Sequence, residues 1–124
     1  MTHPSPGFAR NPSKVLTIEP YRGEVTVEAG GKTIARTNRA LVLSEPPYPA
    51  AFYLPFDDID FTALSPTGHS THCPYKGDAS YWSVPSLGRP GDNAMWAYRF
   101  PYDETAAIKD YGSFYPDRVT IRAT

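Results

Sequence analysis

The residues best suited to chemistry are gathered in one stretch, residues 67–84, which reads TGHSTHCPYKGDASYWSV. It contains the only cysteine, Cys73, and two of the three histidines, His69 and His72. A thiol can act as a nucleophile, and an ammonium close to it, here that of Lys76, makes it more reactive. Cys73 and Lys76 are therefore the candidate catalytic residues, although the stretch specifies no reaction.

The same stretch holds the ligand types of a zinc site but not their number. A structural zinc site takes four ligands, usually as two separated pairs. Here one thiol and two histidines stand together, and no second Cys or His pair follows downstream. We therefore expect no metal and no other cofactor, and we expect the protein to fold without zinc.

The order of residues in this stretch predicts a β-hairpin. Residues 74–77 (PYKG) form its turn, because Pro presets φ and Gly tolerates a left-handed position. Lys76 is then an exposed turn residue, and residues 71–73 and 78–84 form the strands on either side of the turn. Alternation along a strand puts His72 and Cys73 on opposite faces, so these neighbours cannot form a nucleophile–base pair.

Aromatic side chains are the second ingredient of a site. On the second strand of the hairpin, alternation points Trp82 into the core and Tyr81 towards the side that can border a cleft. Residues 94–100 (AMWAYRF) predict another strand, on which Trp96 and Tyr98 share a face with a third ring. Three rings on one face exceed what a sheet edge needs, so they can wall a pocket.

A second hairpin is predicted over residues 24–37, where two alternating strands flank the Gly pair 30–31. A two-residue turn at this pair sets Val27 opposite Ile34. The same register places Arg36 on the apolar face, with its stem packed and its head in water.

Residues 56–61 (FDDIDF) allow two interpretations, which lead to different proteins. As a strand, they hold Asp58 and Asp60 on one face, a spacing with which nucleotidyl-transfer enzymes bind Mg²⁺. As a short helix, they use Asp57 as the N-cap residue. A capping carboxylate is the commoner pattern, and the Gly-Ser step that accompanies nucleotidyl transfer is missing shortly upstream.

Length and composition predict one mainly β domain. The 124 residues include 14 prolines, nine tyrosines and six phenylalanines, and aromatic runs broken by Pro and Gly are typical of short strands joined by turns. Residues 1–13 carry too many prolines for a central strand, so we expect a flexible N-terminal leader there. Residues 14–124 then form a single β-rich domain.

Charge and cysteine content exclude several classes of protein. The net charge is -1 and charges of both signs are scattered, so nucleic acid and membrane surfaces are not expected partners. One cysteine cannot form an intrachain disulfide, and no apolar run of signal-peptide or membrane length begins the sequence. We expect a cytoplasmic protein, and the sequence does not specify its oligomeric state.

Several short motifs occur in one order along most of the chain. They are Ser44-Glu45-Pro46, Phe52-Tyr53-Leu54-Pro55, Asp58, Thr71-His-Cys-Pro-Tyr-Lys-Gly77, Tyr81-Trp82-Ser83, Trp96-Ala97-Tyr98, Pro101 and Phe114-Tyr-Pro-Asp-Arg-Val119. Over about residues 25–121 the chain thus resembles the bacterial and fungal domain of unknown function 427 family. The resemblance implies a β-tent, with two antiparallel sheets packed at an angle and one or two short helices. Some members carry a nucleotidyltransferase-like label, and a related use of this fold is an aromatic cage for a small cyclic imide.

The leading hypothesis is a small-molecule-binding domain, or a small enzyme, that places a compact polar or anionic ligand against aromatic walls near residues 71–81. Lys76 would meet an anionic or carbonyl group, and Thr71 and Tyr53 would supply hydrogen bonds. Tyr81 or Trp96 would stack on a planar ligand.

Three other classes compete with this hypothesis. One is a nucleotide-handling enzyme that uses Asp58 and Asp60 with Mg²⁺, and another is a thiol enzyme that uses Cys73. The third is an interaction domain with no pocket, whose aromatic residues are only core. An open cleft containing Lys76 favours the leading hypothesis, whereas a closed, aromatic-filled domain favours the third alternative.

Overall fold

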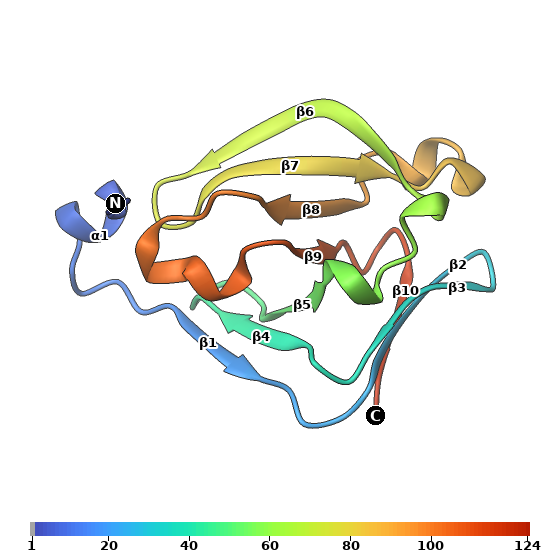
Figure 1. Ribbon diagram of the computed structural model, residues 1–124, viewed down its shortest axis with the longest axis horizontal. Coiled ribbons are helices and arrows are strands. Elements are labelled where there is room, and N and C mark those ends of the chain that lie inside the picture. Colours follow the sequence, from blue (N-terminus) through green and yellow to red (C-terminus); the bar gives the residue numbers. More distant parts are fainter. Residues whose placement is uncertain (1) are drawn as a thin grey trace.

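The computed structural model describes residues 2–124, which form two antiparallel sheets, one short α-helix and several 3₁₀ turns (Figure 1). The expected mainly β fold of two antiparallel sheets with short helices is confirmed. The strands are β1 (Thr17–Pro20), β2 (Val25–Ala29), β3 (Lys32–Thr37), β4 (Leu41–Ser44), β5 (Ala51–Pro55), β6 (Ser65–Cys73), β7 (Gly77–Ser83), β8 (Met95–Tyr98), β9 (Tyr111–Phe114) and β10 (Thr120–Ala123). The helical elements are α1 (Pro6–Arg10), η1 (Phe56–Asp58), η2 (Phe61–Ala63), η3 (Pro85–Leu87), η4 (Arg89–Gly91) and η5 (Asp103–Ile108).

The large sheet has seven strands in the order β1-β4-β5-β9-β8-β7-β6, and the small sheet has three in the order β10-β2-β3. The small sheet runs at a steep angle to the large one (Figure 1). Among residues 2–124, no helix has both the length and the apolar character needed to cross a membrane.

The two faces of the large sheet bury different residues, because successive side chains on a strand point to opposite sides. Leu54, Trp82 and Met95 lie on the face that packs against the valines of the small sheet, and we call it the small-sheet face. Tyr53 and Tyr98 belong to a second cluster on the opposite face, which we call the tyrosine face. The prediction that Trp82 is core is confirmed, since its side chain is 8% exposed.

The hairpin predicted in residues 71–84 is confirmed. Strands β6 and β7 pair antiparallel, with Cys73 opposite Gly77 at the turn end. Gly77 has φ +122, a conformation that favours glycine, and a Cβ there would lie 3.2 Å from the carbonyl oxygen of Phe100. The turn therefore packs closely against the chain that follows β8.

In the second hairpin the predicted turn is confirmed but the predicted register is wrong. Gly30 and Gly31 both have positive φ, as a tight turn requires. A bulge between Val27 and Glu28 then shifts the pairing, so Val27 lies opposite Ala35 rather than Ile34. The extra residue of β3 lets Ile34 and Ala35 both enter the core, at 2% and 3% exposure.

The shift also moves Arg36 away from the predicted apolar face. It lies opposite Thr26, is exposed, and its Nε is 3.8 Å from Glu24 Oε1. The bulge exchanges the faces of every residue beyond it, because the side-chain period of a strand is two.

The prediction that Asp57 caps a helix is wrong. Element η1 follows Pro55 and has no side-chain cap, whereas Asp60 caps η2 by accepting a hydrogen bond of 3.0 Å from the Thr62 amide. The strand interpretation is not confirmed either, since Ile59 makes only an isolated bridge with Ala35. Two short 3₁₀ segments flank Ile59, whose side chain is buried.

The N-terminal residues do not enter a sheet. Element α1 lies beside the turn between β6 and β7 (Figure 1), and Ser5 and Gly7 are buried there. Met1, the first residue of the expected leader, lies outside the described residues. The flexibility of residues 1–13 and the domain boundary at residue 14 stay predictions.

Candidate functional site

A cavity of about 750 Å³ opens mainly on the tyrosine face, where β5 and β9 part from each other. These strands share only two residue pairs, Leu54 with Gly112 and Pro55 with Tyr111. Beyond the pairs, aromatic side chains from both strands and from neighbouring segments line the space. They are Tyr48, Phe52, Tyr53, Trp96, Phe114 and Tyr115.

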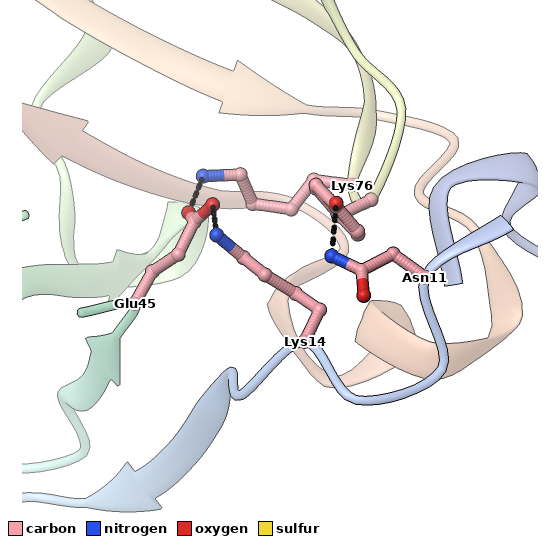
Figure 2. Close-up of polar contacts among 5 residues, drawn as sticks. Asn11, Lys14, Glu45 and Lys76 are labelled. Carbon is pink, nitrogen blue, oxygen red and sulfur yellow. Dashed lines mark hydrogen bonds and ion pairs between the residues drawn. The ribbon is translucent and has the colours of Figure 1, made fainter. Parts of the chain in front are cut away.

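Two of the lining residues, Glu45 and Lys76, are charged. Figure 2 shows that the side chain of Lys14 meets theirs at Glu45. Glu45, just after β4, accepts a hydrogen bond of 3.1 Å from Lys76 Nζ through Oε1, and Oε2 lies 3.1 Å from Lys14 Nζ. The side chains are 13% exposed for Glu45 and Lys76 and 16% for Lys14. We call these three residues the charged cluster. Lys76 is thus not the exposed turn residue that its sequence position suggested.

The electrostatics of the charged cluster favour the charged forms of Glu45 and Lys14. Burial raises the pKa of Glu45, but the hydrogen bonds and charges of Lys76 and Lys14 outweigh that effect and hold this pKa below its ordinary value. The hydrogen bond with Glu45 raises the pKa of Lys14. At neutral pH, two ammonium groups against one carboxylate leave one unit of positive charge at the cavity edge.

The aromatic wall is held in place by a hydrogen bond and by ring contact. Trp96 Nε1 donates to the Tyr53 hydroxyl at 3.1 Å, and the Trp96 and Tyr115 rings are in contact at a tilt of 41°, with centroids 4.5 Å apart. Burial raises the pKa of Tyr53 and Tyr98, and burial together with Tyr81 raises the pKa of Tyr115 to about 12. The hydroxyls of these three tyrosines therefore stay protonated at neutral pH and add no negative charge.

The structure brings most of the predicted site residues together. Tyr53, Cys73, Lys76 and Trp96 all line the cavity. Tyr98 lies next to it, with its ring centroid 5.6 Å from Lys76 Nζ.

Thr71 and Tyr81 lie elsewhere. Their hydroxyls hydrogen-bond to each other at 2.9 Å, Tyr81 is 6% exposed, and neither residue lines this cavity. A direct contact of either with a ligand stays a prediction, whereas their observed contact joins the two strands of the hairpin.

Sequence reasoning missed Glu45 and Lys14 as members of the site. Glu45 stands in one of the motifs quoted above, but nothing in Ser44-Glu45-Pro46 indicates that its partner is 31 residues away. Lys14 follows the proline-rich leader and carries no local signal at all. Only the tertiary fold places it beside β4.

The geometry of Cys73 agrees with the alternation argument. His72 bonds through Nδ1 to Asp78 Oδ1 at 2.7 Å on the exposed side, away from the cavity that Cys73 lines. Within residues 2–124, no group of three or more His, Cys, Asp or Glu side chains is arranged to hold a metal ion.

The two acidic residues of the nucleotide hypothesis bind different partners. Asp58 accepts from Thr37 Oγ1 at 2.6 Å and lies 3.2 Å from Arg39, and the hydrogen bond from Thr37 is the main cause that lowers its pKa. Asp60 is engaged with Thr62. Both border a separate hollow of about 330 Å³, which shares no lining residue with the cavity.

Comparison with known proteins gives one family. The model of a family described as "Domain of unknown function (DUF427)", with the short name NTP_transf_9, matches residues 17–124. Among curated proteins, none matches the sequence. The matched range contains Glu45 and Lys76 but not Lys14.

Proposed function

The chain belongs to the DUF427 family, and from this premise, which specifies no reaction, we propose that the domain binds a small planar ligand in the cavity between β5 and β9. The ligand carries a polar or anionic group, which faces the charged cluster. Its planar part lies against the aromatic wall.

One observation supports this proposal most strongly: the ammonium of Lys76 lies at the edge of an open cavity walled by aromatic side chains. Small-molecule sites are typically concave, mostly apolar, and have few well-placed polar groups. A volume of about 750 Å³ is within the range of such sites, which runs from roughly 300 to 1,000 Å³. The open cleft also disfavours a pocketless interaction domain.

The chemistry of the walls sets the expected affinity. Stacking on an aromatic side chain contributes about 1 to 3 kcal/mol, and each hydrogen bond contributes about 1 kcal/mol. A ligand that uses one ring and two or three hydrogen bonds is then expected to bind with micromolar or weaker affinity.

Cys73 provides a direct test, because it is the only cysteine and lines the cavity. Nucleobases, nucleotides, cyclic imides and small carboxylates are screened at millimolar concentration for slower alkylation of Cys73 by iodoacetamide. A true ligand slows alkylation and quenches the fluorescence of Trp96. A Trp96→Phe variant loses the quenching, whereas a Trp82→Phe variant keeps it, because Trp82 lies on the small-sheet face.

The outcomes separate the proposal from its rivals. If hits require Mg²⁺ and are lost in a variant with Asn at both Asp58 and Asp60, the nucleotide-handling enzyme replaces this proposal. A compound that forms a covalent product on Cys73 indicates the thiol enzyme. If no compound changes alkylation or fluorescence at millimolar concentration, the interaction domain becomes the better account.

A further inference from the structure

The N-terminal residues are fastened to the hairpin turn by several contacts. Ser5 Oγ donates to the Pro74 carbonyl at 2.6 Å, and the Gly7 amide donates to the same oxygen at 2.9 Å. The Ser5 amide donates to Glu104 Oε1 at 2.9 Å. A Cβ on Gly7 would lie 2.7 Å from the Pro74 oxygen, so this close approach requires glycine.

Lys14 follows this attached segment and, although it is not itself a lining residue, it contacts Glu45, which lines the cavity. Besides its contact with Glu45, Lys14 Nζ lies 5.0 Å from the ring centroid of Tyr75 and 5.8 Å from that of Tyr48, which lines the cavity. Figure 2 shows Lys14 and Lys76 reaching Glu45 from different segments of the chain. Without Lys14, Glu45 and Lys76 would form an electrically neutral pair.

We infer that Lys14, a residue outside the matched family range, determines the ligand specificity of the cavity by selecting a planar molecule with an anionic group. This inference rests on the proposed function. Each ammonium has three N–H donors and uses one on Glu45, so both keep donors for a ligand. A monoanion neutralises the excess charge of the cluster, whereas a cation would meet two like charges.

Within the protein, the carboxylate of Glu45 balances one of the two positive charges. It contacts both ammonium groups and so reduces the repulsion between them. The hydroxyls of Tyr53, Tyr98 and Tyr115 stay protonated at neutral pH and so offer no competing negative charge. The ligand's anionic group is therefore the remaining partner for the charge that Lys14 adds.

The test compares two probes of equal shape, 2-naphthoate and 2-naphthamide, which differ in charge. Their dissociation constants are measured by tryptophan fluorescence on the full chain. We expect the unmodified protein to prefer naphthoate by about tenfold or more, the scale of a charge-assisted hydrogen bond. Lys14→Gln should lower this preference at least fivefold through naphthoate alone, so unchanged naphthamide binding confirms that the variant is folded.

Two further variants separate charge from position. Arg10→Gln removes the same charge from the same segment. Arg10 is exposed, and among residues 2–124 its side chain bonds only to the Pro6 carbonyl, so the preference should change less than twofold. Gly7→Ala should release the segment and reduce the preference as Lys14→Gln does, without altering a cavity residue.

Different failures overturn different statements. Equal affinity for both probes in the unmodified protein, or an unchanged preference in Lys14→Gln, overturns this inference while the cavity still binds planar ligands as proposed. Equal losses in Arg10→Gln and Lys14→Gln also overturn it, since net charge alone then explains the result. If neither probe binds at millimolar concentration, the inference fails and the proposed binding site loses its support as well.

Discussion

The two faces of the large sheet bury aromatic residues in opposite ways. On the small-sheet face, Trp82 packs edge-on against Phe56 and Phe61, at centroid distances of 5.8 and 6.0 Å. On the tyrosine face, Trp96 hydrogen-bonds to Tyr53 and contacts the partly exposed ring of Tyr115. The two tryptophans lie on adjacent strands, yet one is core and the other is cavity wall.

The difference between the two faces follows from whether their aromatic side chains carry polar atoms. Phe56 and Phe61 have no polar atoms, so the rings around Trp82 can close on each other without leaving a donor or acceptor unpaired. Tyrosine hydroxyls need hydrogen-bond partners, so Tyr53 accepts from Trp96 and Tyr81 bonds to Thr71 on the neighbouring strand. We conclude that the small-sheet face is mainly closed core, while the cavity that we propose as a binding site opens mainly on the tyrosine face.

The largest expected effect is a loss of stability, and it tests directly whether the two faces differ. Trp82→Ala should destabilise the domain by about 3 to 5 kcal/mol, as large aromatic truncations in cores do. Trp96→Ala should cost less, because its ring already borders an open cavity. Urea denaturation of both variants measures the difference, and equal losses would mean that the two faces are equally structural.

The next effect concerns the charged cluster. Glu45→Gln keeps the shape but removes the charge between two ammonium groups, so a loss of roughly 1 to 3 kcal/mol is expected. The pKa of Glu45 is lowered in the folded state, so its stabilisation is fully present above its ordinary value near 4.5 and is lost as pH falls through the folded pKa.

The free energy of unfolding, measured between pH 7 and pH 3, tests that sign. The gap between the unmodified protein and Glu45→Gln should narrow as the pH falls below about 4.5. Asp58 and Asp60 also have lowered pKa values, but both proteins share them, so their contribution cancels in the difference. A gap that widens with acid would show that Glu45 is not held ionised by its lysines.

A smaller effect tests whether the second hollow, which Asp58 and Asp60 border, has a chemical role. Replacing Asp58 and Asp60 together by Asn should cost less stability than either change above, because an Asn side chain can still accept hydrogen bonds from Thr37 and Thr62. Mg²⁺ binding, measured by calorimetry, should be the same before and after the change. A Mg²⁺ affinity that disappears in the double variant would assign a function to these carboxylates.

The smallest expected effect is zero. Among the residues that the structure describes, 2–124, no group of three or more His, Cys, Asp or Glu side chains is arranged to hold a metal, so we expect EDTA to leave the melting temperature unchanged. Elemental analysis of the purified protein provides the control, and stoichiometric zinc would contradict the expectation.

Much of the fold could be predicted because its signals are local. The turns at Gly30-Gly31 and at Pro74–Gly77 are specified by residues within the turns themselves, and alternation alone identified Trp82 as core. The bulge that buries Ile34 could not be predicted, because the advantage of burying it depends on the large sheet packed against it.

The site could be predicted only in part, for the same reason. Lys76 and Trp96 were identified by residue type, since an ammonium and a large ring are suited to ligand binding wherever they occur. Glu45 and Lys14 belong to the site only because of their contacts with each other and with Lys76, and these three residues are far apart in the sequence. Side-chain chemistry can be read from a sequence, whereas partnerships across the fold cannot.

The short pairing between β5 and β9, which we call the seam, has a consequence for the rates of folding and unfolding. Its two residue pairs join parts of the chain that are 58 and 56 positions apart, and Ser113 Oγ strengthens it by donating to the Phe52 carbonyl at 2.8 Å. Pairings between distant residues form late in folding, since a long loop must close first. The cavity therefore does not exist until the seam has closed, so a bound ligand should slow unfolding and leave the folding rate almost unchanged.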